Sequence, residues 1–322
     1  MKFGTFILLL FIFASCASSK QASFLRNVQK SSCNQENSYK YTKADIPRPL
    51  YQITIDSAIA SHFNYKDLNI ANAIGVLDLL TDYVKEKALI SKDSSLQNQI
   101  DMIHIGQELN HRIDLASLEI SSVSAELDCE EERIDQIAGY LSEKEKKKET
   151  NLTVGSIILG SLSAITTGVL VAKKDESNFS DYMGVGVGVA DATFGILMLT
   201  SNRKITLEHK RNVLREIWFG SDTSTVYPPS IWYYLNTANP AKNEISLRQQ
   251  LINNWMNFGQ VKDIRGRKKN KAPNIEIYFG EGGKYTIDEL ENRANMYDQI
   301  ESMIKLMKQD LRNLSLSIGK LH

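Results

Sequence analysis

Residues 152–172, LTVGSIILGSLSAITTGVLVA, form a run of 21 residues without a charged side chain in the middle of the chain. A second apolar stretch, residues 183–200, follows after ten mostly polar residues. As helices, both stretches are long enough to cross a hydrocarbon layer of about 30 Å. The sequence therefore predicts a membrane-competent apolar helical hairpin over residues 150–202. The open alternative is two glycine-rich helices buried in the core of a water-soluble helical protein.

Small residues recur at every fourth position of both stretches, which places them on one stripe of each helix, where two backbones can approach closely. The stripe of the first arm consists of Ser156, Gly160, Ala164, Gly168 and Ala172, and that of the second arm includes Gly184, Gly188 and Ala192. These residues are predicted to form the seam between the two arms.

Asp191 is the one charge-bearing residue of the second arm, and it shares its helical face with Gly184, Gly188 and Gly195. An acidic side chain near a bilayer centre costs about 2.5–3.5 kcal/mol on insertion scales, so we expect it to face the seam. Two interpretations remain open. Asp191 either packs in the seam and accepts a hydrogen bond from Ser161 or Ser163, or it lines a pore formed by several copies.

The N-terminus has the pattern of an export signal over residues 1–15. Lys2 precedes an apolar run at residues 6–13, and small residues follow. The sequence Phe13-Ala14-Ser15-Cys16 resembles the bacterial lipobox, with Phe where that pattern more often has Leu. The resemblance implies cleavage before Cys16 and acylation of its thiol, with palmitate as one acyl group, and of its new amino group. It places the protein in the cell envelope, at the outer membrane or periplasmic face.

Residues 16–45 are rich in Ser, Asn, Gln and Lys and are expected to form a flexible tether. Cys33 lies in this tether and Cys129 in a predicted helix, in a compartment that permits disulfides. Two cysteines this far apart show no framework spacing. Pairing therefore stays open, and unpaired thiols are favoured.

The fold class indicated is mainly α. Residues 46–149 read as a helical region, with one long helix over residues 91–148. Its apolar positions alternate in steps of three and four, as in a coiled coil; they are Leu109, Ile113, Ala116, Ile120, Val123, Leu127, Ile134, Ile137 and Leu141, with Glu130 as a polar break. This helix is expected to form a stalk with the apolar hairpin at its tip.

Residues 203–322 are expected to return along the stalk. The pattern predicts helices over residues 205–218 and 244–258, with a loop-rich stretch between them. A small β-hairpin is predicted from residues 274–279 and 284–287. A second heptad segment closes the chain, at Tyr297, Ile300, Ile304, Met307, Leu311, Leu314, Ile318 and Leu321. The two heptad segments are expected to pack against each other.

No motif indicates catalysis or a cofactor. His104, Glu108 and His111 share one helical face, but a dimetal site needs a second Glu-x-x-His element that the chain lacks, so a solvated stalk surface is favoured. Residues 280–283 lack phosphate-loop spacing and are predicted to form a turn. The basic run at residues 265–271 is read as a solvated loop, with contact to acidic lipid or glycan as the alternative. Lys and Arg total 38 and Asp and Glu total 38, so no net charge recruits nucleic acid.

The layout of a long heptad helix, an apolar hairpin and returning helices resembles the α-helical pore-forming toxins of the cytolysin A and haemolysin BL type. The small-residue stripes separately resemble the glycine-zipper segments of envelope lipoproteins. We predict a non-enzymatic, lipid-anchored envelope protein that scaffolds or bridges membranes. Its expected partners are the lipid membrane and either further copies of itself or other envelope proteins. The alternative is a pore-forming effector of the toxin type.

Overall fold

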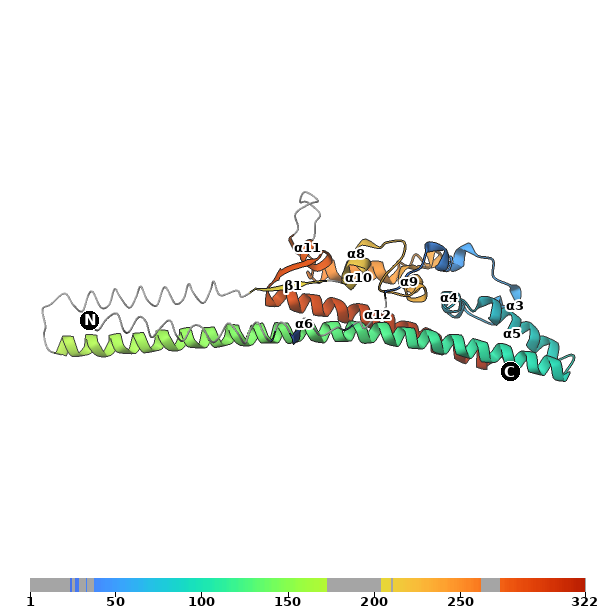
Figure 1. Ribbon diagram of the computed structural model, residues 1–322, viewed down its shortest axis with the longest axis horizontal. Coiled ribbons are helices and arrows are strands. Elements are labelled where there is room, and N and C mark those ends of the chain that lie inside the picture. Colours follow the sequence, from blue (N-terminus) through green and yellow to red (C-terminus); the bar gives the residue numbers. More distant parts are fainter. Residues whose placement is uncertain are drawn as a thin grey trace. The chain divides into compact units, whose positions relative to one another are not determined.

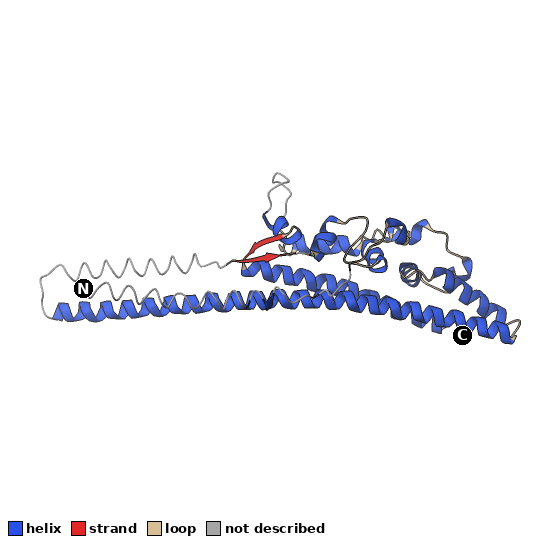
Figure 2. Ribbon diagram, in the orientation of Figure 1, coloured by secondary structure: helices blue, strands red, loops and turns tan. Residues whose placement is uncertain are grey.

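The computed structural model describes residues 24, 27–28, 33, 38–172, 204–209, 211–261 and 273–321, with backbone alone at residues 159–160, 162–172 and 273–274. The described chain is mainly helical, as predicted, and has one two-stranded sheet (Figure 2). It divides into two compact units. Unit 1 comprises residues 1–133, 209–282 and 292–322, and unit 2 comprises residues 134–208 and 283–291.

The longest element is helix α6, Leu96–Ala172, with 77 residues (Figure 1). It includes residues 96–148 of the stalk helix predicted over residues 91–148, and it continues through the whole first apolar arm without a break. The absence of proline from this stretch explains its continuity, because an internal proline would remove a backbone hydrogen bond and clash with the preceding turn.

In unit 1, helix α12 (Ile287–Gly319) lies alongside α6 (Figure 1). Lys308 donates a hydrogen bond of 2.6 Å to the hydroxyl of Ser121, and carboxylate oxygens of Asp128 and Glu301 lie within 4.8 Å of each other. The predicted heptad positions supply the core between them. Those buried in unit 1 are Leu109, Ala116, Ile120, Val123, Leu127, Tyr297, Ile300, Ile304, Met307, Leu311 and Leu314. The predicted packing of the two heptad segments is confirmed here.

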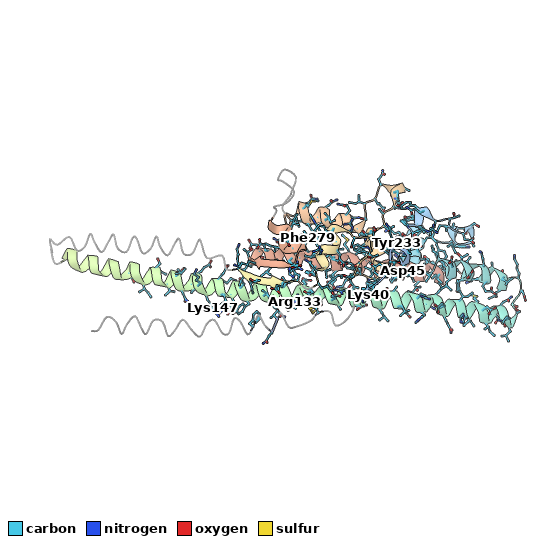
Figure 3. The ribbon with its side chains drawn as sticks, turned by 45° about the horizontal axis from the view of Figure 1, so that its top comes forward. Lys40, Asp45, Arg133, Lys147, Tyr233 and Phe279 are labelled. Atoms are coloured by element: carbon cyan, nitrogen blue, oxygen red, sulfur yellow. A yellow bond between two sulfur atoms is a disulfide. The ribbon has the colours of Figure 1, made fainter. Side chains whose placement is uncertain are left out.

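Four short helices form a second layer of unit 1. They are α8 (Val213–Phe219), α9 (Pro229–Asn236), α10 (Leu247–Asn257) and α11 (Pro273–Phe279). Their core is aromatic: the rings of Trp218 and Phe279 stack with centroids 4.5 Å apart, and the Phe279 and Trp255 centroids are 6.0 Å apart. Phe279 is labelled in Figure 3.

Helix α9 corrects the expectation of a loop-rich stretch over residues 220–240. Pro229 occupies the first turn, where a missing N–H costs nothing. The five residues Ile231–Leu235 that follow are all buried. An aromatic run enclosed by other helices can therefore be helical without any amphipathic period.

The N-terminal part of unit 1 contains α3 (Ser57–Ala60), α4 (Tyr65–Ala73) and α5 (Leu77–Ile90), preceded by the short 3-10 turns η1 (Lys43–Asp45) and η2 (Leu50–Gln52). Apolar residues alternate in steps of three and four here, and Ile70, Ala73, Leu80 and Val84 are buried while Leu77 is half-buried. Gly75 separates α4 from α5 with a φ of 70°, a conformation that glycine adopts without strain.

Two predicted elements near the sheet are wrong. Strand β1, Ile205–Glu208, occupies the start of the predicted helix 205–218, and it pairs with strand β2, Gly282–Tyr285. Residues 274–279 belong to helix α11 instead of forming a β-hairpin strand. Burial alternates along β1, with Ile205 and Leu207 buried and the residues between them exposed, which is the period of a strand. The core of unit 2 includes Ile134, Ile137, Leu141, Ile205, Leu207, Tyr285 and Leu290.

Candidate functional site

The C-terminal part of α6 exposes large apolar side chains where the uncharged segment begins. Val154 is 48% exposed, Ile157 64% and Ile158 52%. Residues at i, i+3 and i+4 of a helix lie on one face, so these three side chains form an apolar patch. We call Val154, Ile157 and Ile158 the apolar patch of α6.

The predicted seam residues of the first arm lie in this same helix. Gly160, Ala164, Gly168 and Ala172 are in helical backbone, and Ser156 is half-buried, so spacing by four keeps them on one side of α6. Cys16 and the second-arm residues Gly184, Gly188, Asp191, Ala192 and Gly195 lie outside the described residues.

Ser161, one of the two residues expected to bond Asp191, donates its hydroxyl to the carbonyl of Ile158 at 2.9 Å, within its own helix. Across the described residues, no helix combines the length and the apolar character needed to cross a membrane.

The charged run at residues 142–149 precedes the apolar patch on α6. Glu143 and Lys147 form an ion pair, and the hydrogen bond from Lys147 lowers the pKa of Glu143. The ammonium of Lys144 lies 5.5 Å from the ring centroid of Tyr140. Glu143 and Lys147 are both exposed, and Lys147 is labelled in Figure 3.

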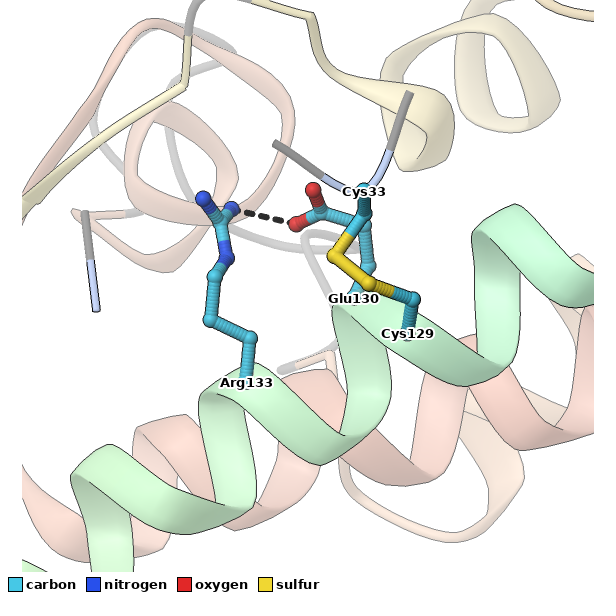
Figure 4. Close-up of a disulfide and its surroundings, with 4 residues drawn as sticks. All are labelled: Cys33, Cys129, Glu130 and Arg133. Carbon is cyan, nitrogen blue, oxygen red and sulfur yellow. Dashed lines mark hydrogen bonds and ion pairs between the residues drawn. A yellow bond between two sulfur atoms is a disulfide. The ribbon is translucent and has the colours of Figure 1, made fainter. Parts of the chain in front are cut away.

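Cys33 and Cys129 form a disulfide, with Cα atoms 5.4 Å apart (Figure 4). The expectation of unpaired thiols is therefore wrong. Spacing along the chain could not reveal the pair, because the fold and not the sequence brings residue 33 onto α6. The adjacent Glu130, the predicted polar break in the heptad seam, is paired with Arg133.

A buried guanidinium joins three segments of unit 1. Arg293 on α12 is 1% exposed and donates hydrogen bonds to the carbonyl of Tyr278 at 2.8 Å, to the hydroxyl of Tyr297 at 3.0 Å and to the side-chain oxygen of Asn212 at 3.3 Å. Asn212 in turn donates to the carbonyls of Tyr278 and Gly280 at 2.9 and 2.8 Å. These neutral oxygens satisfy much of the hydrogen-bonding capacity of a buried cation, which costs several kcal/mol to desolvate.

His209 lies close to this cationic centre. Burial, with the positive charges of Arg293 and Arg133, lowers the pKa of His209 to about 2. The imidazole is therefore neutral at any physiological pH. Burial also raises the pKa of Tyr297, whose hydroxyl accepts from Arg293. Neither His209 nor Tyr297 lines one of the three clefts of unit 1, so both pKa shifts belong to the packed interior and not to a cleft.

The histidine-containing face of α6 is exposed at His104 and His111, and Glu108 forms an ion pair of 2.9 Å with Arg112. This agrees with the predicted solvated surface. Residues 280–281 connect α11 to β2 and residues 282–283 begin that strand, which differs from the predicted turn between two strands. The basic run at residues 265–271 lies outside the described residues.

Unit 1 carries three clefts on its surface. The first, of about 610 Å³, is lined by charged residues that include Arg48, Asp78, Asp82 and the ion pair Asp56–Lys85. The second, of about 640 Å³, contains Arg211, whose guanidinium is 2.9 Å from Glu126, beside Arg215 and Phe219.

The third cleft, of about 350 Å³, has a different composition. Two tyrosines, four side-chain amides and three aliphatic residues line it together with two lysines and two carboxylates; they include Tyr65, Asn69, Tyr234, Ile245, Gln250, Leu306, Gln309 and Asp310. We call it the amide cleft. Its residues come from α4, α9, α10, α12 and the turn between α9 and α10.

Sequence reasoning did not single out the amide cleft, because its residues come from distant segments and share no spacing. Tyr234, which lines the cleft, lies in the stretch predicted to be loop-rich. No protein-family model, no curated protein and no solved structure matches this chain.

Proposed function

We propose that this protein is a non-enzymatic scaffold of a bacterial cell envelope, anchored by lipid at Cys16 and attached to a membrane a second time through the apolar hairpin of residues 150–202. The observation that carries the proposal is the apolar patch of α6. Exposed apolar side chains on one helical face can mark protein or membrane contacts, and this patch differs from the other exposed apolar residues of α6 because it lies within the uncharged segment. The patch lies near the start of the run of 21 uncharged residues, 152–172.

Two further observations support the scaffold. Helix α6 is packed against α12 in unit 1 and is continuous with the apolar segment. A continuous helix can hold the groups at its two ends apart, as a spacer does. The charged run at residues 142–149 precedes the patch, and lysines at that place can reach lipid headgroups with their ammonium groups.

The experiment is fractionation of the native envelope, with full-length protein extracted by alkali and then by detergent. Cys16→Ser should abolish lipid labelling and leave the signal uncleaved. Protein without residues 1–16 has neither the signal nor the lipid, and its Ile157→Asp, Ile158→Asp double variant should bind lipid vesicles more weakly than the same protein with both isoleucines. Leu118→Asp, which alters an equally exposed apolar residue of α6 outside the segment, is the control and should leave that binding unchanged.

Persistent lipid labelling in Cys16→Ser would overturn the anchor. Equal behaviour of the Leu118 and Ile157/Ile158 variants would overturn the second attachment. The toxin-type alternative predicts cation-selective conductance across planar bilayers that Asp191→Asn weakens, since acidic side chains in a pore attract cations. A scaffold gives no conductance, and its Asp191→Asn variant associates with membranes at least as well as the wild type.

A further inference from the structure

We propose that the amide cleft binds a neutral saccharide. This inference goes beyond the proposed membrane scaffold and does not depend on it, because all the residues of the cleft belong to unit 1. The cleft volume of about 350 Å³ lies within the range of about 300–1,000 Å³ typical of small-molecule sites.

The charges of the lining favour an uncharged ligand. Lys66 and Lys242 are balanced by Glu244 and Asp310, whereas the first cleft has an excess of carboxylates. An ionic ligand entering the amide cleft would meet both signs of charge and gain little. Side-chain amides, which both donate and accept hydrogen bonds, make up much of the remaining polar lining.

Two side chains of the lining, Asn69 and Asp310, have part of their hydrogen-bonding capacity unused by the described residues. The side-chain oxygen of Asn69 accepts from the hydroxyl of Tyr233 at 2.8 Å, while its NH₂ group makes no hydrogen bond within the described chain. One carboxylate oxygen of Asp310 accepts from the hydroxyl of Tyr234 at 2.9 Å, and the other is unused by described residues. A sugar hydroxyl is both donor and acceptor, so neighbouring hydroxyls of one ring match such an arrangement.

The hydroxyl of Tyr65 is an independent indication of a polar ligand. Its oxygen is buried and has no hydrogen-bond partner among the described residues, although Tyr65 lines the cleft. Nearly all buried polar groups in native structures are paired with protein or with an ordered molecule. The hydroxyl oxygen is covered by neighbouring atoms, so a ligand would reach it only after a small side-chain movement, and the proposal rests on the exposed groups of the lining.

The apolar side of the cleft completes the match. Ile245 is 48% exposed and Leu306 38% exposed, and both lie in the lining with the aromatic bodies of Tyr65 and Tyr234. A pyranose ring carries its C–H groups on its faces and its hydroxyls around its rim. The cleft pairs apolar surface with hydrogen-bonding groups in the same way, which neither an ion nor a wholly apolar ligand would use.

The test is isothermal titration calorimetry of the full-length protein with cellotetraose, maltotetraose and chitotetraose. The protein is kept in a detergent that has no sugar headgroup. We expect at least one of them to bind with a Kd of about 0.1–1 mM, which is −5.5 to −4 kcal/mol. Asn69→Ala and Gln309→Ala should each weaken that binding about tenfold, the usual worth of one lost hydrogen bond in a site. Gln309 is exposed, so its variant retains the fold.

Asp78→Asn, in the first cleft, is the matched control and should leave the affinity unchanged. Absence of binding by all three oligosaccharides at 10-fold the expected Kd, or equal affinity in the Asn69, Gln309 and wild-type proteins, would overturn the proposal. Tighter binding of a neutral tetrapeptide than of any oligosaccharide would also overturn it, because it would assign the cleft to peptide. None of these outcomes bears on envelope fractionation, so the two proposals fail separately.

Discussion

Ile120 offers the sharpest test of the helix pair in unit 1, because its side chain is fully buried while Leu118, two residues earlier on α6, is 65% exposed. The change Ile120→Ala removes three carbon atoms, worth about 2.4 kcal/mol at about 0.8 kcal/mol for each methylene-sized group. A residual cavity of about 50 Å³ would add about 1.2 kcal/mol. We therefore expect the free energy of unfolding to fall by about 3.5 kcal/mol.

The assay is urea denaturation of full-length protein followed by circular dichroism, with Leu118→Ala as the matched control. That change should alter the free energy of unfolding by at most about 0.5 kcal/mol, since exposed sites seldom contribute more. Ile120→Asp should destabilise more than Ile120→Ala, because it also buries a charge. Similar losses from Ile120→Ala and Leu118→Ala would refute the assignment of the buried face and with it the heptad packing.

Three further perturbations test the interior of unit 1. Cys129→Ser should lower the free energy of unfolding by about 4–5 kcal/mol, because opening a loop of roughly 100 residues gives the unfolded chain more entropy. In urea denaturation, Cys33→Ser and the reduced wild type should show the same loss. A wild-type stability that does not change with reductant would contradict the disulfide. The pKa of His209 is lowered to about 2 in the folded protein, so on acidification the unfolded state takes up a proton on this side chain at a higher pH than the folded state does. The free energy of unfolding should therefore fall by about 2 kcal/mol as the pH drops from 7 to 5. The loss continues until the pH approaches the pKa of the folded state. His209→Gln should flatten that dependence in urea titrations at each pH, and an unchanged slope would assign the acid sensitivity to other groups. Arg293→Lys should cost about 2–3 kcal/mol because an ammonium cannot hold Tyr278, Asn212 and Tyr297 in one plane, and a wild-type melting temperature would show that these bonds are dispensable.

The long helices could be predicted from sequence because their evidence is periodic and local. Apart from Glu130, every third or fourth residue from Leu109 to Leu141 and from Tyr297 to Leu314 is apolar, and most of these positions are buried. Gly75 and Pro229 are local signals as well, because glycine permits the positive φ between α4 and α5 and proline suits the first turn of α9. The prediction of a loop-rich stretch over residues 220–240 is nonetheless wrong at α9, where the aromatic residues after Pro229 are buried in a helix.

The failures share a physical cause, which is dependence on distant partners. Ile205–Glu208 is a strand because Gly282–Tyr285 lies beside it, and no local pattern names a partner that far along the chain. The pairing of Cys33 with Cys129 and the gathering of Asn69, Tyr234 and Asp310 around one cleft likewise follow from tertiary packing. The lipid anchor and the second arm of the hairpin stay predictions from sequence.

The disulfide also determines how the chain would carry a mechanical load. A pull applied between the N-terminus and the C-terminal end of α6 passes from Cys33 directly into Cys129 through the sulfur atoms. The intervening 95 residues, among them α3, α4, α5 and the first part of α6, form a closed loop that carries no tension while the bond is intact. A protein held at Cys16 and again at its apolar hairpin could thus be stretched between its two attachments without drawing out the helices of that loop. Reduction of one covalent bond would place those same helices in the line of force.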